Sequence, residues 1–261
     1  EKQDGVPVRE LSLIAFPTRE LFLEKVNEFD LIIFDRYSKR GLLPNNYLAS
    51  VVDYTKRGGA VLIASGPAFA GVNSIYRTPL STMLPAQPTA RIYEKGYLPT
   101  ITDIGNRHPV TENLEQFSPS FGNDKDTPWG RWFRHIDADP KSGSVVMTGV
   151  DDRPLLLLDR VGEGRIAMML SDQAWLWSRG FEGGGPQLEL LRRLAHWMMK
   201  EPELEEERLT ATSVGQNVTI VRRSLSEENK PVTLETPAGQ ELQLDLEAIS
   251  PGRWQGSFTG A

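Results

Sequence analysis

The chain contains no cysteine among its 261 residues. Thiolate nucleophiles, thiolate zinc sites and disulfide bonds are therefore excluded. It also has no apolar run that approaches the ~20 residues needed to span a bilayer. The longest runs, such as the four leucines at 155–158, have the length of a strand. We therefore expect no membrane-spanning segment within these residues and no chemistry based on sulfur.

The chain lacks the excess of positive charge that binding to a polyanion requires. Its 29 Lys and Arg residues are outnumbered by 35 Asp and Glu residues, which gives a net charge of −6. Because binding to a phosphate backbone needs a dense basic patch, the composition argues against nucleic acid as a partner.

There is also no initiator Met and no signal peptide. We therefore expect Glu1 to begin a fragment whose targeting or anchoring segment lies elsewhere.

The first third of the chain alternates short apolar runs with helix-length segments. Apolar runs at residues 11–16, 30–35 and 60–64 predict strands. Between them, Thr18 is placed to cap one helix, and Pro44 lies at the first turn of another. Strands separated by helices predict βαβ units and a largely parallel sheet.

Strand-like runs return later in the chain. Residues 144–147, 154–159 and 165–170 are apolar, and the glycines of the turn at 161–164 predict a hairpin between the last two runs. A glycine-rich loop at 183–185 then leads into an amphipathic helix. This half of the sequence therefore continues the same α/β pattern.

The composition changes after residue 200. We interpret residues 1–200 as one α/β domain, residues 201–208 as an acidic linker and residues 209–261 as a β-rich domain. In the last segment apolar and polar residues alternate, as at 242–246. About four strands are fewer than the roughly seven of an immunoglobulin-like sandwich. We therefore expect a truncated sandwich of that kind.

Three segments together resemble the class I glutamine amidotransferase-like domains of large bacterial membrane proteins of unknown function. They are KRGGAVLIASGP at 56–67, HPVT at 108–111, and the stretch from Pro154 through RGFEGGGP at 179–186. The resemblance covers about residues 8–208. It implies a flavodoxin-like α/β three-layer sandwich, a membrane-anchored parent protein, and a location outside the cytoplasm, in the periplasm.

Two departures from that family bear on activity. A working class I amidotransferase places a cysteine on a tight turn after one strand and a His-x-Glu pair after a later one. Here the corresponding positions carry SGP at 65–67 and SDQ at 171–173. Without a thiolate and an imidazole, glutamine hydrolysis has neither nucleophile nor proton shuttle. The resemblance then describes the ancestry of a pseudoenzyme.

Ligands of open parallel sheets bind in the crevice beyond the carboxyl ends of the strands. The polar residues that follow the predicted strands are therefore the candidate ligand-binding residues. They are Asp35, Arg36, Tyr37, Ser65, Gly66, Ser171, Asp172 and Gln173. The alternative is that these side chains only cap helices and loops.

The residue types of a serine-based catalytic triad are also present in the sequence. Ser65 would be the nucleophile, His108 the base, and Asp35 or Asp172 the orienting carboxylate. Ser65 lacks the Gly-x-Ser-x-Gly frame of a hydrolase, however, and His108 precedes a proline in a loop. A structural role for both residues is the alternative.

The signals for metal and anion sites are weaker. His135, Asp137 and Asp139 alternate along one segment, but no standard metal site has that spacing. Residues 123–126 form only part of a calcium loop. We expect solvated loops and no bound metal or cofactor. The glycines at 183–185 could hold an anion at a helix start or simply cap that helix.

The tryptophans form two short clusters. They are Trp129 and Trp132 in one segment, beside Phe133, and Trp175 and Trp177 in another. The spacing of the second pair suits one face of a strand, so the two segments are expected to pack together in the core. The alternative is a stacking platform for sugar rings or for a partner's aromatic residue.

The sequence thus predicts a non-catalytic binding or scaffolding module of a membrane-anchored envelope protein. Its partner would be an unidentified protein or envelope component, and it would need no cofactor. Two alternatives stay open, which are a serine-type hydrolase that uses Ser65 and His108, and a carbohydrate-binding domain that uses the tryptophans.

Overall fold

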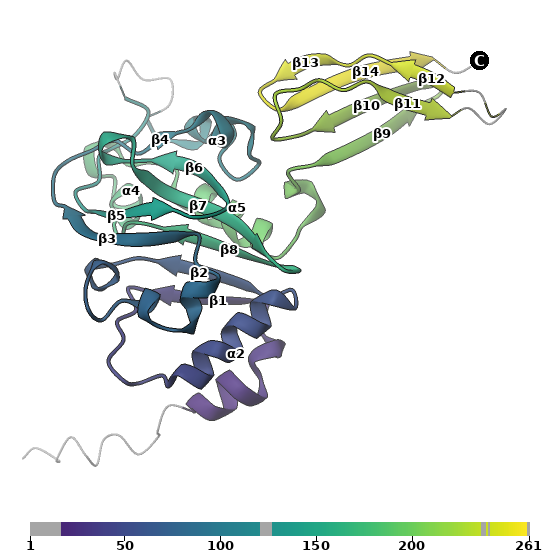
Figure 1. Cartoon of the computed structure of the whole chain (residues 1–261). Coiled ribbons are helices and arrows are strands. Elements are labelled where there is room, and N and C mark those ends of the chain that lie inside the picture. Colours follow the sequence, from purple (N-terminus) through teal and green to yellow (C-terminus); the bar gives the residue numbers. More distant parts are fainter. Residues whose placement is uncertain (1–16, 121–126, 236–238, 240, 260–261) are drawn as a thin grey trace, which may run out of the picture.

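The computed structural model describes residues 17–120, 127–235, 239 and 241–259. The larger unit is built on a six-stranded sheet (Figure 1). In spatial order, its strands are β1 (Leu31–Asp35), β2 (Ala60–Ala64), β8 (Gly164–Met169), β7 (Pro154–Val161), β6 (Ser144–Thr148) and β4 (Thr100–Ile101). The apolar runs at 30–35, 60–64, 144–147, 154–159 and 165–170 all form strands, as the sequence predicts.

The sheet is mixed, and the prediction of a flavodoxin-like three-layer sandwich is wrong. Only β1, β2 and β8 are parallel neighbours, whereas β7, β6 and β4 each pair antiparallel to the preceding strand. The reason is local. β7 and β8 are joined by two residues, Gly162 and Glu163, and so short a turn can only connect antiparallel strands.

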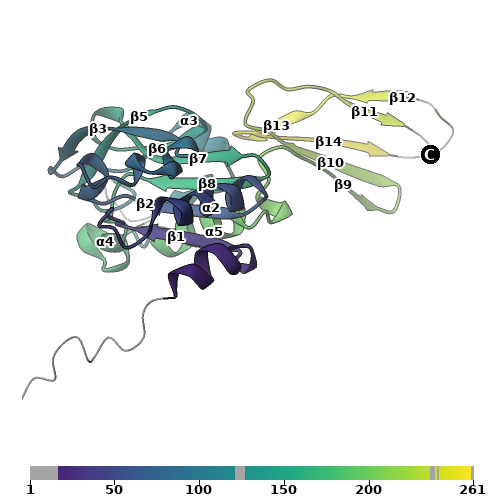
Figure 2. The same cartoon turned by 60° about the horizontal axis from the view of Figure 1, so that its bottom comes forward.

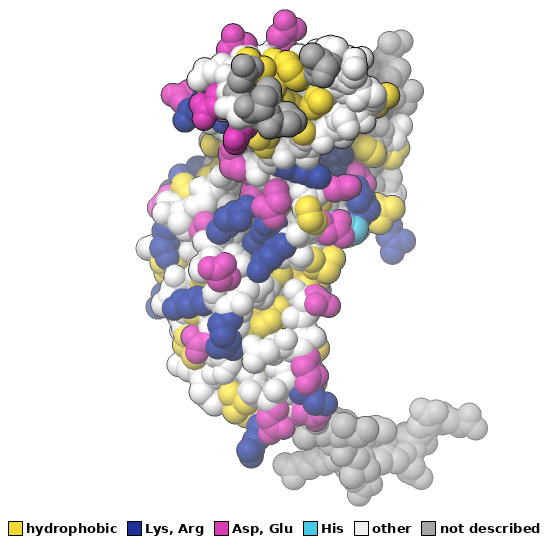
Figure 3. Space-filling view, turned by 90° about the vertical axis from the view of Figure 1, so that its right-hand side faces the viewer, with side chains coloured by type: hydrophobic (Ala, Val, Ile, Leu, Met, Phe, Trp, Pro, Cys, Tyr) yellow, Lys and Arg dark blue, Asp and Glu magenta, His cyan; other side chains and the backbone are white. Residues whose placement is uncertain are grey.

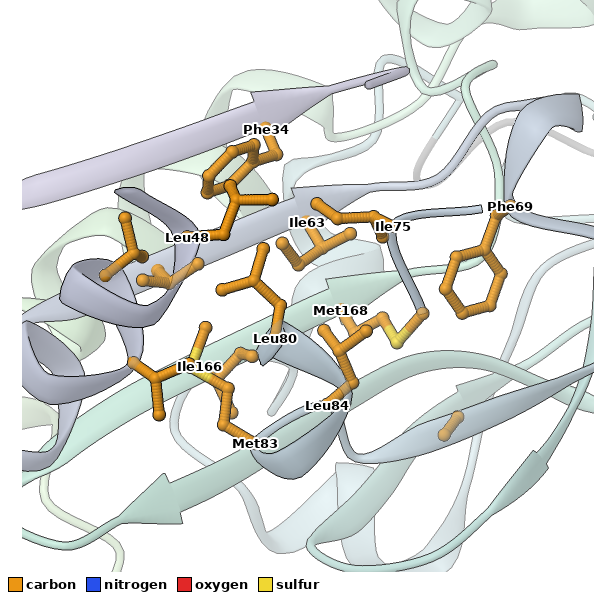
Figure 4. Close-up of a cluster of buried hydrophobic side chains, with 14 of the residues drawn as sticks. Phe34, Leu48, Ile63, Phe69, Ile75, Leu80, Met83, Leu84, Ile166 and Met168 are labelled. Atoms are coloured by element: carbon orange, nitrogen blue, oxygen red, sulfur yellow. The ribbon is translucent and has the colours of Figure 1, made fainter. Parts of the chain in front are cut away.

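Two hydrophobic cores lie on opposite faces of this sheet. Helix α2 (Asn45–Lys56) and the 3-10 helix Pro79–Thr82 cover one face, where Leu48 and Leu80 are fully buried (Figure 4). Helices α4 (Trp175–Ser178) and α5 (Gln187–Met198) belong to the other core, with Leu190 and Leu194 buried. The alternation of strand side chains between faces supplies both cores from the same strands.

The helix predicted to follow Thr18 is irregular in the structure. A π-helix at Glu20–Glu24 is followed by a 3-10 turn at Val26–Glu28, and only Val26 is buried there. Phe29 is 41% exposed. The strand predicted at residues 11–16 lies outside the described residues.

The middle of the chain, between β2 and β6, supplies a second small sheet and several short helices. β3 (Ala86–Tyr93) pairs antiparallel with β5 (His135–Pro140), and α3 (Asp103–Arg107) packs on β6. The remaining 3-10 helices are Pro67–Ala70, Ile75–Arg77, Leu114–Phe117, Val150–Asp152, Phe181–Gly183 and Pro202–Leu204.

The C-terminal unit is entirely β-structure. Its four-stranded antiparallel sheet contains, in spatial order, β13 (Glu247–Ser250), β14 (Arg253–Thr259), β10 (Asn217–Arg223) and β9 (Arg208–Val214). β11 (Val232–Glu235) and β12 (Glu241–Leu244) form a hairpin, and Figure 2 shows this unit beside the α/β unit. Its core is small, with only Ile220, Leu246 and Trp254 buried in the hydrophobic cluster of the described residues.

Two features of the surface bear on partners. Within the part of the chain that the structure describes, no helix combines the length and the hydropathy needed to cross a bilayer. On the face drawn in Figure 3, basic and acidic side chains are interspersed rather than gathered by sign.

Candidate functional site

The carboxyl ends of β1, β2 and β8 meet at one edge of the sheet, where a cavity of about 390 Å³ opens. We call it the crevice. It is lined by Asp35, Arg36, Leu62, Ala64, Met169, Ser171, Asp172, Ala174, Trp175, Gln187 and Leu191. The strands supply its floor, and the segments around α4 and the start of α5 supply the rest. Four of the residues predicted from the sequence therefore line one cavity, namely Asp35, Arg36, Ser171 and Asp172.

Asp35 and Arg36 form the exposed polar side of the crevice. Their side chains are 68% and 64% exposed, and the Arg36 Nε lies 3.8 Å from the Asp35 Oδ1. Arg36 has a left-handed backbone with φ +46°, while its N–H continues the ladder by donating to the Ala64 carbonyl at 2.8 Å. A non-glycine residue in this conformation is held there by its surroundings at some cost in free energy.

Gly66 explains how Arg36 fits against the neighbouring loop. A Cβ at Gly66 would stand 3.0 Å from the Arg36 Cγ and 3.1 Å from its Cβ. The absence of a side chain at Gly66 therefore leaves room for the Arg36 side chain against the loop that follows β2. Ser65 itself is 3% exposed, and its Oγ has no hydrogen-bond partner among the described residues. It does not line the crevice.

The three polar residues after β8 mostly bond inward. Ser171 Oγ donates to the Arg134 carbonyl at 2.6 Å, and Asp172 forms an ion pair with Arg134 at 3.1 Å. Gln173 Oε1 accepts from the Phe133 N–H at 2.6 Å. These side chains fasten the segment that follows β8 to the segment before β5. Asp172 is only 5% exposed, so Arg134 neutralises it at the back of the crevice.

Tyr37 belongs to a different cavity. It lines an apolar groove of about 480 Å³ together with Phe22, Ile32, Phe34 and Leu43. Burial of its hydroxyl raises the pKa of Tyr37 above the usual value. The structure therefore places it beside the crevice residues in sequence, but on the other side of β1.

His108 lies at the opposite end of the sheet from Ser65. It is 1% exposed and packs against Trp197 of α5, with ring centroids 5.6 Å apart. The Ser65 N–H donates to the Met169 carbonyl at the end of β8, whereas Trp197 lies beside Arg165 at its start. Four residues of strand separate these points, about 13 Å. The structure does not bring Ser65 and His108 together.

The partners of His108 were not found from the sequence. Its Nδ1 accepts from the Val110 N–H at 3.1 Å, so its Nε2 carries the proton and faces the Glu206 Oε1 at 3.4 Å. Burial lowers the pKa of His108, although Glu206 opposes this shift. Glu206 also accepts from Trp197 Nε1 at 2.9 Å and from Arg160.

A second buried carboxylate ties the C-terminal unit to the α/β unit. Glu112 is 8% exposed and accepts from Arg223 at 3.1 Å and from the Arg253 Nε at 3.0 Å. Its backbone carbonyl accepts from Arg193 at 2.6 Å. We call the region that contains Glu112, His108 and Glu206 the junction. The sequence predicts that Glu206 lies in an acidic linker, whereas in the structure both Glu206 and Glu112 are buried.

The tryptophans divide into a buried group and one exposed residue. Trp132 and Trp177 have ring centroids 4.8 Å apart, Trp129 and Trp177 5.1 Å, and all three are at most 2% exposed. Trp175 is 52% exposed. The prediction that Trp175 and Trp177 share a strand face is wrong, because both lie on α4, where a spacing of two turns side chains to different sides.

The weaker candidates are accounted for by protein contacts. His135 Nε2 lies 2.7 Å from the Pro154 carbonyl, and Arg153 pairs with Asp137 at 2.5 Å and Asp139 at 2.6 Å. Among the described residues no cluster of three or more His, Asp or Glu side chains is suited to a metal ion. Residues 123–126 lie outside the described residues. At 183–185, the Gly184 carbonyl accepts from the Gly130 N–H at 2.8 Å.

Comparison with known proteins yields similar structures but no family. No family model matches the chain, and no curated protein matches its sequence. The structure of Cytoplasmic Protein STM3548 from Salmonella typhimurium is 22% identical, covers 71% of this chain and 76% of its own, and has a TM-score of 0.53. At this identity the likeness shows a shared fold alone.

Other similar structures are more distant. Cytoplasmic Protein STM1381 from Salmonella typhimurium LT2 is 18% identical, with 75% of this chain and 84% of that chain covered and a TM-score of 0.47. A β-galactosidase from Rahnella sp. R3 is 12% identical, with 90% and 33% covered and a TM-score of 0.42. Glycoside hydrolases are thus among the similar structures. None of these three is described as an amidotransferase, so that family resemblance stays a prediction.

Proposed function

We propose that the chain is a non-catalytic carbohydrate-binding module and that the crevice is its binding site. The observation that carries this proposal is the composition of the crevice. A half-exposed indole, Trp175, and the exposed carboxylate of Asp35 line the same cavity of about 390 Å³. A tryptophan face suits the C–H face of a pyranose ring, and carboxylates accept hydrogen bonds from its hydroxyls.

The separation of Ser65 from His108 argues against a serine-type hydrolase at the crevice. Ser65 is buried away from the cavity, and His108 is held by Val110 and Glu206 at the other end of the sheet. A nucleophilic hydroxyl needs a base within hydrogen-bond reach. The proposal therefore assigns no chemical step to these residues.

Ligand binding can be measured through one fluorophore. The other five tryptophans are at most 6% exposed, so acrylamide quenching reports chiefly on Trp175. We expect a bound mono- or disaccharide to protect Trp175 from acrylamide in the wild-type chain. Trp175→Ala should weaken binding about tenfold or more, measured by calorimetry, because stacking on one aromatic ring is worth about 1–2 kcal/mol.

Leu188→Ala is the matched control. Leu188 is 83% exposed on α5 next to Gln187 of the crevice, but does not line the cavity. Its substitution should leave affinity within a factor of two. If no saccharide from a panel of neutral and acidic hexoses protects Trp175 at millimolar concentration, the proposal is overturned.

A further inference from the structure

Arg36 differs from Arg57 and Arg160, two other arginines that line cavities. Arg57 donates to Asn27 at 2.8 Å, and Arg160 donates to Glu205 at 2.8 Å. The Arg36 guanidinium makes no hydrogen bond within the described part of the chain, and its nearest charge is Asp35 at 3.8 Å. An exposed ion pair at this distance is weak and easily exchanged for another anion. The donors of Arg36 are therefore available to a ligand.

The backbone fixes where those donors are offered. Arg36 follows the last residue of β1, its N–H donates to the Ala64 carbonyl, and Gly66 leaves room for its side chain against the loop that follows β2. Its left-handed conformation persists although most residue types are strained there. Strain of this kind is concentrated at ligand-binding sites. The Arg36 backbone is therefore hydrogen-bonded to the sheet at the edge of the crevice and does not lie on a free loop.

Arg36 is the exposed cation of the crevice, and its geometry suits a carboxylate. Arg134 neutralises Asp172 at 3.1 Å, which leaves Asp35 and Arg36 as the exposed charges of the site. A guanidinium binds a carboxylate through two parallel hydrogen bonds. A doubly charged phosphate would be attracted more strongly by Arg36 and repelled more strongly by Asp35, so the preference for a carboxylate rests on the match between its two oxygens and the two parallel donors of the guanidinium.

Building on the proposed function, we infer that Arg36 is the specificity-determining residue and that the ligand is an acidic sugar. The sugar carboxylate pairs with the Arg36 guanidinium, its hydroxyls donate to Asp35, and its ring lies against Trp175. The three groups line one cavity of about 390 Å³, and we place a single uronate residue within it. No bond is made or broken.

The test compares sugars that differ only at one carbon. Glucose and glucuronate share a ring, as do galactose and galacturonate, and each pair is titrated against the wild-type chain by calorimetry. We expect at least one uronate to bind about tenfold or more tightly than its neutral partner at low salt. The preference should decrease as salt rises, because the added interaction is ionic.

Substitutions then assign the preference to Arg36. Arg36→Gln should lower uronate affinity about tenfold or more, and Arg36→Lys should recover only part of it because the planar fork is lost. Arg36→Gly removes the guanidinium while suiting the left-handed backbone, so its melting temperature should equal or exceed that of the wild type. Arg208→Gln, in the C-terminal unit on β9, is the control and should change nothing.

The outcomes separate the two proposals. If neutral sugars and uronates bind equally well, or if Arg36→Gln keeps the preference, the inference about Arg36 fails while the carbohydrate site stands. Tighter binding of glucose 6-phosphate than of glucuronate would also overturn it. If no sugar binds at all, both proposals are overturned.

Discussion

The crevice and the junction use the same kinds of side chain in opposite ways. At the crevice Asp35, Arg36 and Trp175 are each more than half exposed. At the junction His108, Glu112 and Glu206 are each at most 8% exposed, and each has protein partners. Charge at the junction therefore holds the molecule together, whereas charge at the crevice is available to a ligand. Burial and pairing distinguish the two roles, and residue type does not.

The largest effect is expected from removal of the central carboxylate of the junction. Glu112→Ala removes the carboxylate that pairs with Arg223, whose side chain is only 13% exposed and which keeps the Glu203 carbonyl as an acceptor. Breaking a buried ion pair costs about 3 kcal/mol or more. We expect urea denaturation to show a loss of that size in the free energy of unfolding. Glu115→Ala, an exposed neighbour, should change it by about 0.5 kcal/mol or less.

A smaller effect should appear in the pH dependence of stability. Burial lowers the pKa of His108 and His135 below 6.5. Below that pH these histidines are therefore protonated more in the unfolded chain than in the native chain. Stability from this source is then present above about pH 6.5 and falls as the pH decreases, with a slope of at most about 1.4 kcal/mol per pH unit for each histidine.

His108→Asn tests this assignment. The asparagine amide oxygen can replace the Nδ1 as acceptor for Val110, but it does not titrate. We expect the slope of unfolding free energy between pH 6.5 and 5.5 to fall by about half, with His135 responsible for the rest. The acid limb caused by the lowered pKa of Glu206 lies below pH 4.5, outside this window. An unchanged slope would show that His108 is not held neutral.

The smallest effect should be seen at Ser65. Its Oγ is buried without a partner in the described part of the chain, so Ser65→Ala removes an unsatisfied polar group. We expect the free energy of unfolding to stay the same or to rise by up to about 1 kcal/mol, and sugar binding to be unchanged. Ser171→Ala breaks a hydrogen bond to the Arg134 carbonyl and should cost about 1 kcal/mol. Equal losses in both variants would mean that Ser65 has a partner.

The sequence located the crevice but not the junction. Apolar runs identified β1, β2 and β8, and the rule that ligands bind beyond their carboxyl ends then pointed to Asp35, Arg36, Ser171 and Asp172. His108 and Glu206 are far apart in the chain and meet only because α5 and the segment after it fold back onto β7 and β8. No local sequence pattern predicts a contact between two residues so far apart in the chain.

The errors about the fold have a similar origin. The glycines around Gly162 correctly predict a hairpin, whereas the family resemblance predicts a parallel sheet. The hairpin makes β7 and β8 antiparallel, so the sheet is mixed. A spacing of two between Trp175 and Trp177 suits a strand, yet the segment is a short helix. Without the fold, the sequence could not show that only one tryptophan is exposed.

The end of the sheet at which each region lies has a consequence for ligand exchange. Figure 1 shows the course of β8 through the sheet. Arg165, near its start, pairs with Glu205, next to the junction, and Met169, at its end, lines the crevice. A small molecule can therefore enter and leave without any movement of the C-terminal unit. Occupancy of the cavity and attachment of the β-rich unit are spatially uncoupled, and each can change during evolution without disturbing the other.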